Sequence, residues 1–155
     1  MHISISTEYA IHSVLYMAIH QNHPVILVSE IAEALKIPES YLAKVFRNLA
    51  KSGLIRSFRG AKGGYSLGRS PAKITLDDLV KVIEGQTPMY QCLAERRGCG
   101  AEKICNIITA FNEAEERMYR HLKKVNFEDL KDFALRHSEV IAMPTNNPPS
   151  KRDSK

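Results

Sequence analysis

The sequence contains no tryptophan, no long apolar stretch and only three cysteines among its 155 residues. A membrane-spanning helix needs about 18 or more consecutive apolar residues, and no stretch of this chain approaches that length. The N-terminus has neither the basic start nor the small-residue cleavage site of a secretory signal peptide. Three cysteines cannot all be paired within the chain, and a chain of this size folds without a disulfide framework. We therefore expect a cytoplasmic protein that has no membrane partner and consists of one small domain with an extension.

Acidic residues are absent from residues 40–73. This segment holds eight basic residues, whereas the whole chain has a net charge of only +5, so the rest of the chain is net negative. A solvated helix face usually mixes both signs of charge. A basic patch on an otherwise acidic molecule is more typical of a protein that binds a polyanion such as DNA.

Apolar residues at helical spacing predict three helices in the N-terminal third of the chain. Thr7 is a candidate cap for the first, and the Ile-Pro pair at 37–38 ends the second. The third begins near Glu39 or Ser40 and ends at Gly53. Two short helices joined by a tight turn, the second of them basic, form a helix-turn-helix.

A glycine-rich basic loop follows the third predicted helix. Residues 54–58 and 65–67 have the pattern of short strands, and between them lies the sequence RGAKGG at 59–64. In a nucleotide-binding loop, a helix that begins with Lys and Ser or Thr would follow the glycines, but here a strand follows. The segment therefore predicts a two-stranded wing.

Three further helices are predicted beyond the wing, and the last is an amphipathic helix capped by Asn126. Thr75 and Asp78 form a capping-box-like start to a helix that ends at Gly85. Residues 104–125 carry apolar positions three and four apart over about three heptads. This stripe could pack within its own domain, but a DNA reader with one recognition helix gains specificity by dimerising, which favours pairing with a second copy.

The predicted fold is mostly α, a winged helix-turn-helix with a long dimerisation helix and a small two-stranded wing. The DNA-binding domain takes residues 1–85, a cysteine-bearing loop residues 86–103, and the dimerisation helices residues 104–143. Residues 144–155 contain three of the seven prolines and are predicted to be a disordered tail. No constellation of catalytic residues is visible, so we expect no enzyme activity.

Three features together form a recognisable pattern: the wing at 57–69, the start of the third helix at 40–42, and a three-cysteine loop before a long helix. The pattern resembles the iron–sulfur-sensing winged-helix transcriptional repressors that include IscR, NsrR and RirA, over about residues 1–140. The resemblance implies a homodimer whose long helices form the dimer seam. It also implies that a bound cluster tunes the affinity for a pseudopalindromic operator in double-stranded DNA.

The basic segment supplies the residues that we expect to contact DNA. Side chains of the recognition helix should face the major groove, and those of the wing should face the adjacent minor groove or the phosphates. The predicted contacts are Ser40, Tyr41, Lys44 and Arg47 in the helix, and Arg59 and Lys62 in the wing.

The three cysteines, Cys92, Cys99 and Cys105, are separated by six and five residues. This spacing matches neither zinc ribbons nor the ferredoxin pattern, so by itself it leaves an iron–sulfur cluster, a structural zinc site and a thiol switch open. The resemblance favours an iron–sulfur cluster, [2Fe–2S] or [4Fe–4S], held by the three thiolates.

A cluster held by three cysteines needs a fourth ligand. IscR-like members have a histidine three residues after the last cysteine, where this chain has Ile108. NsrR-like members use an acidic residue at the start of the first helix, which corresponds here to Glu8. His12 lies one turn later on the same face and is the alternative ligand. Glu8 could equally be a first-turn acid favoured by the helix dipole, and His12 a half-buried surface histidine.

Overall fold

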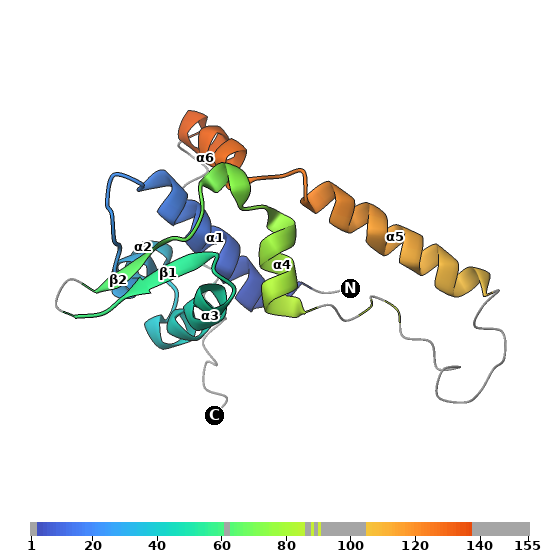
Figure 1. Ribbon diagram of the computed structural model, residues 1–155, viewed down its shortest axis with the longest axis horizontal. Helices are drawn as coiled ribbons and strands as arrows, with labels where there is room; N and C mark the ends of the chain where they lie inside the picture. Colours follow the sequence, from blue (N-terminus) through green and yellow to red (C-terminus); the bar gives the residue numbers. More distant parts are fainter. Residues whose placement is uncertain (1–2, 61–62, 86–87, 89, 91–104, 138–155) are drawn as a thin grey trace, which may run out of the picture.

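The computed structural model describes residues 3–60, 63–85, 88, 90 and 105–137. In this part of the chain, six α-helices and a short 3-10 helix accompany a two-stranded antiparallel sheet. The elements are α1 (Ile5–Ile19), α2 (Val28–Leu35), α3 (Glu39–Lys51), β1 (Ile55–Phe58), β2 (Gly64–Leu67), η1 (Pro71–Lys73), α4 (Leu76–Glu84), α5 (Asn106–Leu122) and α6 (Phe127–Arg136). Figure 1 shows one body that contains every element except α5, which extends away from it. None of these helices is long and apolar enough to cross a membrane.

The helix α1 lies at the centre of the body, where it contacts α2, α3, α4 and α6. Ala10 and Val14 of α1 are completely buried, as are Phe46 of α3, Leu79 of α4 and Phe127 of α6. These side chains belong to one apolar core, whose burial is the main favourable contribution to folding. The core thus fixes the positions of α3 and α4 relative to α1.

The tight turn between α2 and α3 is confirmed. Lys36 takes the left-handed conformation with φ 53°, and the N–H of Ile37 donates to the carbonyl of Ala32 at 2.9 Å. Ile37 is buried, and Pro38 stands at the N-cap of α3. Gly53, with φ 75°, follows the end of α3, as its sequence position predicts.

The predicted wing is also confirmed, with Ile55 opposite Leu67 and Phe58 opposite Gly64. Its second strand is anchored to the segment before α2 because Tyr65 and Ile26 exchange two backbone hydrogen bonds of 2.8 and 2.9 Å. Gly64 has φ 147°, and a Cβ atom there would lie 2.6 Å from the carbonyl oxygen of Ile26. This close approach of two backbones requires glycine.

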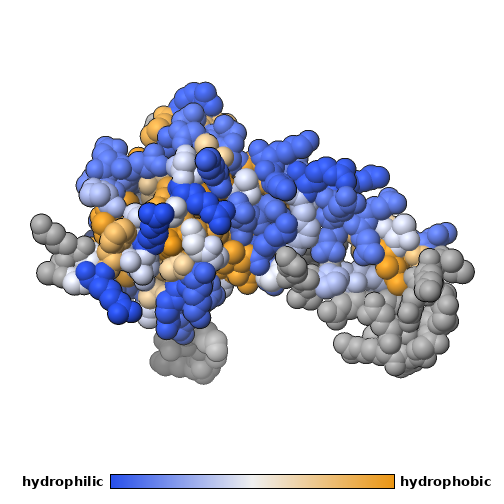
Figure 2. Space-filling view, in the orientation of Figure 1, coloured by the Kyte–Doolittle hydropathy of each residue, from blue (hydrophilic) through white to orange (hydrophobic). Residues whose placement is uncertain are grey.

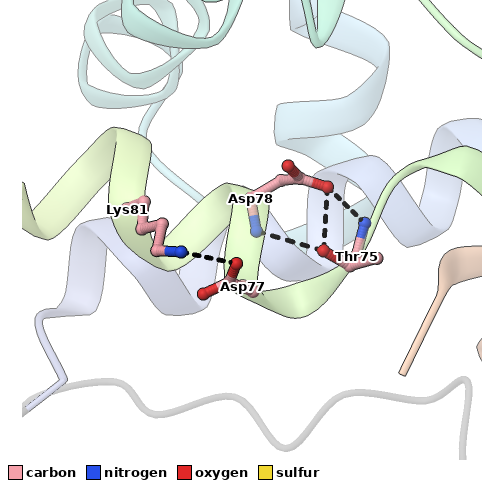
Figure 3. A network of polar contacts seen from close by, with 4 residues as sticks. All are labelled: Thr75, Asp77, Asp78 and Lys81. Carbon is pink, nitrogen blue, oxygen red and sulfur yellow. Dashed lines mark hydrogen bonds and ion pairs between the residues drawn. The ribbon is translucent and has the colours of Figure 1, made fainter. Parts of the chain in front are cut away.

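The helix caps correct one expectation. Ser4, and not Thr7, is the N-cap of α1, where its side chain accepts a hydrogen bond from the N–H of Thr7. Thr7 itself is fully buried in the first turn. The predicted capping box of α4 is present, because Thr75 and Asp78 each accept a hydrogen bond from the other's backbone N–H (Figure 3).

The last two helices have different surroundings. No residue of α5 is buried, and this helix meets the body at α4, where the Lys81 ammonium lies 5.3 Å from the ring centre of Tyr119. In contrast, α6 packs on α1 and η1. Backbone hydrogen bonds of 3.0 Å from Leu76 to Val125 and from Phe127 to Ile74 fix the start of α6 on the body.

Candidate nucleic-acid interface

The helix α3 presents an exposed polar face, and its one acidic residue, Glu39, is the first residue of the helix. Its apolar side chains Leu42, Val45, Phe46 and Leu49 are buried against the body. Because side chains three and four positions apart share a helix face, Ser40, Lys44 and Arg47 lie together on the opposite, exposed side. The structure therefore brings three of the four predicted contacts of this helix together.

Tyr41 is not brought together with those three. Its side chain is half-buried against α1, where its hydroxyl lies 2.7 Å from the Ser6 hydroxyl. Its ring meets the ring of Tyr9 edge-on, with 5.5 Å between the ring centres. The aromatic side chain thus joins α3 to α1, a role that the sequence did not indicate because Ser6 lies 35 positions away.

The wing carries further exposed cations. Arg59 follows β1 and is exposed, whereas Lys62 lies outside the described residues. Arg56 and Arg69 are also exposed, and with Phe58 they line an open hollow of about 570 Å³ between the end of α3 and the sheet. Both arginines belong to the acid-free segment but were not among the predicted contacts. Strand alternation, which places Arg56 on the face of β1 opposite the buried Ile55, could have indicated the first of them.

The cations of this segment form no ion pairs within the described part of the chain. All four ion pairs found there lie in α4, α5 and α6, with Lys81–Asp77 in α4 as one example (Figure 3). The exposed basic side chains of α3 and the wing are therefore available to external phosphates, which is the arrangement that binding to DNA requires.

Only some of the candidate metal ligands lie in the part of the chain that the structure describes. Cys105 is a free, half-buried cysteine at the N-cap of α5, while Cys92 and Cys99 lie outside the described residues. The described residues alone contain no group of three His, Cys, Asp or Glu side chains that could hold a metal ion.

Glu8 and His12 lie on one face of α1, one helical turn apart. Glu8 is exposed and His12 is half-buried. The Nδ1 atom of His12 is buried and has no hydrogen-bond partner. Burial lowers the pKa of His12 below its ordinary value, and the charge of Glu8 opposes this effect. A neutral imidazole and an exposed carboxylate are both suitable donors for iron, so this pair fits a fourth-ligand role chemically.

Comparison with known proteins places the chain in a family. Residues 3–132 match the model of the Rrf2 family, described as iron-dependent transcriptional regulators. The transcriptional regulator NsrR of Geobacillus kaustophilus is 30% identical over 131 residues, which cover 84% of this chain and 89% of that protein. The regulator IscR of Xenorhabdus nematophila is 26% identical over 152 residues, or 98% of this chain and 90% of that protein.

The fold has a counterpart among solved structures. CymR, described as the global cysteine regulator of B. subtilis, matches with a TM-score of 0.62 and 28% identity, over 86% of this chain and 98% of that chain. These matches confirm the winged-helix fold and the resemblance to regulators that include IscR and NsrR. They also confirm a DNA-binding regulator rather than an enzyme, since the family and its relatives are transcriptional regulators. The chain therefore belongs to the Rrf2 family of transcriptional regulators.

Proposed function

We propose that this regulator is a cytoplasmic homodimeric repressor that binds a pseudopalindromic operator, with an affinity set by an iron–sulfur cluster. The observation that carries the regulatory part of the proposal is the donor set. The free cysteine Cys105 caps the start of α5, the Glu8 carboxylate lies in the first turn of α1 with the half-buried His12 imidazole one turn later, and two more cysteines stand in the sequence between α4 and α5. The description of the family as iron-dependent supports the same conclusion.

The exposed face of α3 is the proposed reader of the operator. Ser40, Lys44 and Arg47 would enter the major groove, which is wide enough for one α-helix. Arg59 and Lys62 of the wing would contact the adjacent minor groove or the phosphates. Tyr41 would support the start of the helix at the edge of this contact.

Dimerisation through α5 is supported by the exposure of its apolar residues. Ile107 is 59% exposed and Phe111 is 38% exposed, although both are large apolar side chains. Figure 2 shows apolar surface at the end of α5 farthest from the body, while most of the visible face of this helix is hydrophilic. A two-fold dimer would present two copies of α3 to successive major grooves, about 34 Å apart, and so requires a pseudopalindromic site.

The proposed cluster ligands are Cys92, Cys99 and Cys105, with Glu8 or alternatively His12 as the fourth. The cluster would be the part of the protein that responds to the signal, because it would be gained, lost or damaged according to the supply of iron or the presence of nitric oxide or oxidants. The fourth ligand lies on α1, which packs against α3. A cluster bound to a ligand on α1 would therefore favour one arrangement of the two α3 helices in the dimer. Gain or loss of the cluster would change the operator affinity through this arrangement.

A second candidate function keeps the DNA-binding part and replaces the cluster with thiol chemistry or a structural zinc ion. The structural match to the cysteine regulator CymR favours this alternative specifically. In that case the three cysteines would respond to oxidation, or hold zinc with a fourth ligand.

One experiment separates the two functions. The full chain is purified anaerobically, and its visible absorption spectrum is recorded together with its iron, sulfide and zinc content. A brown protein with iron and sulfide, whose operator affinity differs from that of the triple variant Cys92→Ala, Cys99→Ala, Cys105→Ala at one salt concentration, supports the cluster sensor. A colourless protein, or equal operator affinities, contradicts it.

A further inference from the structure

The end of α4 is tied to the first turn of α1. Glu84, the last residue of α4, accepts a hydrogen bond from the N–H of Ser4 at 2.8 Å and another from the hydroxyl of Thr7. Thr7 is fully buried and Glu84 is half-buried, so both bonds are largely shielded from water. Hydrogen bonds to a charged acceptor in such surroundings are stronger than those at an open surface. The cysteine-bearing segment begins in the sequence two residues later.

The same turn of α1 is tied to the start of α3. Ser6 lies between Ser4 and Thr7 in sequence, and its hydroxyl forms the 2.7 Å hydrogen bond with Tyr41. Tyr41 is the third residue of α3 and directly follows Ser40, one of the proposed operator contacts. A displacement of this turn must therefore either move the start of α3 or break its bond to Tyr41.

The corner where α1, α3 and α4 meet is not filled by side chains. A hollow of about 220 Å³ that is open to solvent lies there, and its walls include Ser6 of α1, Lys44 of α3 and Ile83 of α4. Because no side chains interdigitate across this hollow, packing resists small shifts of the three helices less there than in the core. The hydrogen bonds of Glu84 and Tyr41 then hold this corner in the arrangement seen here.

We propose that Glu84 and Tyr41 are positioning residues of a relay that joins the start of the cysteine-bearing segment to the recognition helix. The relay consists of the Glu84–Thr7 bond, the first turn of α1 and the Ser6–Tyr41 bond. The relay rests on the proposed function in one respect: gain or loss of the cluster is what would displace the first turn of α1. The mechanical link itself needs no cluster, since every contact in it lies within the described residues.

The link is tested first on the cluster-free full chain, as a double-mutant cycle. Thr7→Val removes the donor to Glu84 and keeps the side-chain shape, and Tyr41→Phe removes the hydroxyl bonded to Ser6. Loss of one such bond corresponds to a change of about threefold to tenfold in operator affinity. We expect Thr7→Val to lower the affinity by this factor in the wild-type background and by less than twofold in the Tyr41→Phe background.

Two additional variants complete the cycle. Ser6→Ala removes the other partner of the Ser6–Tyr41 hydrogen bond and should have the same effect on operator affinity as Tyr41→Phe. This comparison remains possible if Thr7→Val does not fold. Tyr16→Phe is the matched control, since its hydroxyl contacts Glu30 at 3.4 Å on the α2 side of α1. It should leave the operator affinity unchanged. Additive effects of Thr7→Val and Tyr41→Phe, or wild-type affinity in Ser6→Ala, would overturn the relay.

The cluster-loaded protein separates failure of the relay from failure of the sensor. The ratio of the operator affinities with and without the cluster should approach one in Tyr41→Phe. In contrast, Lys44→Ala should lower both affinities by the same factor and keep the wild-type ratio. If the ratio is one in the wild-type protein, the proposed sensor function is contradicted. The double-mutant cycle on the cluster-free chain still decides whether the relay exists. If the ratio differs from one in the wild type and is the same in Tyr41→Phe, the relay is overturned and the sensor function is not.

Discussion

Replacement of Phe111 by lysine should convert the proposed dimer into monomers. The Phe111 side chain is stacked on Tyr90, with 4.4 Å between the ring centres, and it remains 38% exposed. A phenylalanine that offers about 200 Å² leaves on the order of 75 Å² for a partner to cover, worth about 2 kcal/mol per subunit. A two-fold interface contains this contact twice, so the variant loses about 4 kcal/mol, or about a thousandfold in the dimer dissociation constant.

The added charge increases this loss, because a lysine ammonium would face an apolar seam without a partner. The assay is light scattering or sedimentation over a dilution series of the full chain. Asn112→Lys is the matched control, since it adds the same charge at an exposed position near Glu116 and Arg120, which form an ion pair on the polar face of α5. A dimer that resists Phe111→Lys as strongly as it resists Asn112→Lys would refute the reasoning and place the seam on another surface.

Three further outcomes are expected. Lys62→Ala should weaken binding to all DNA sequences and reduce the slope of log affinity against log salt by about one unit per subunit, whereas Arg59→Ala should also reduce the preference for the operator over random DNA, as measured by fluorescence anisotropy. Cys105→Ala should abolish the brown chromophore, whereas Glu8→Ala should keep a cluster that a chelator removes faster, because thiolates bind iron more tightly than a carboxylate does. Equal rates of cluster loss in Glu8→Ala and the wild type would exclude Glu8 as a ligand. Because burial lowers the pKa of His12 in the folded state, the unfolded state takes up protons more readily below the ordinary value of 6.5, and the melting temperature of the cluster-free chain should fall as the pH drops through this value. A smaller fall in His12→Gln is the expected result, and an unchanged pH profile would contradict it.

The sequence predicted local structure well wherever neighbouring residues determine it. The Ile-Pro pair at 37–38 gave the turn before α3, the glycines at 63–64 gave the wing, and Thr75 with Asp78 gave the capping box. The helical conformation that Pro38 disfavours at Ile37, the pairing of the two wing strands and the hydrogen bonds of the capping box all involve residues that are close in the chain. Short-range chemistry therefore sufficed.

The wrong cap and the unforeseen position of Tyr41 have a common physical cause. Ser4 and Thr7 are both good N-cap residues, and the choice between them depends on Glu84, which is 77 positions from Thr7 and takes its hydroxyl. The orientation of Tyr41 likewise depends on Ser6 in another helix. Helical periodicity carries no information about such distant partners, so these features required the folded chain.

The absence of ion pairs from the described part of the basic segment has a consequence for solution measurements. In many DNA-binding proteins, a cation must leave an intramolecular carboxylate before it can reach a phosphate, and added salt then acts on both equilibria. Here the cations of α3 and the wing that the structure describes form no ion pair that would have to break first. The salt dependence of operator binding should therefore report counterion release from the DNA alone, and its slope should count the neutralised phosphates directly.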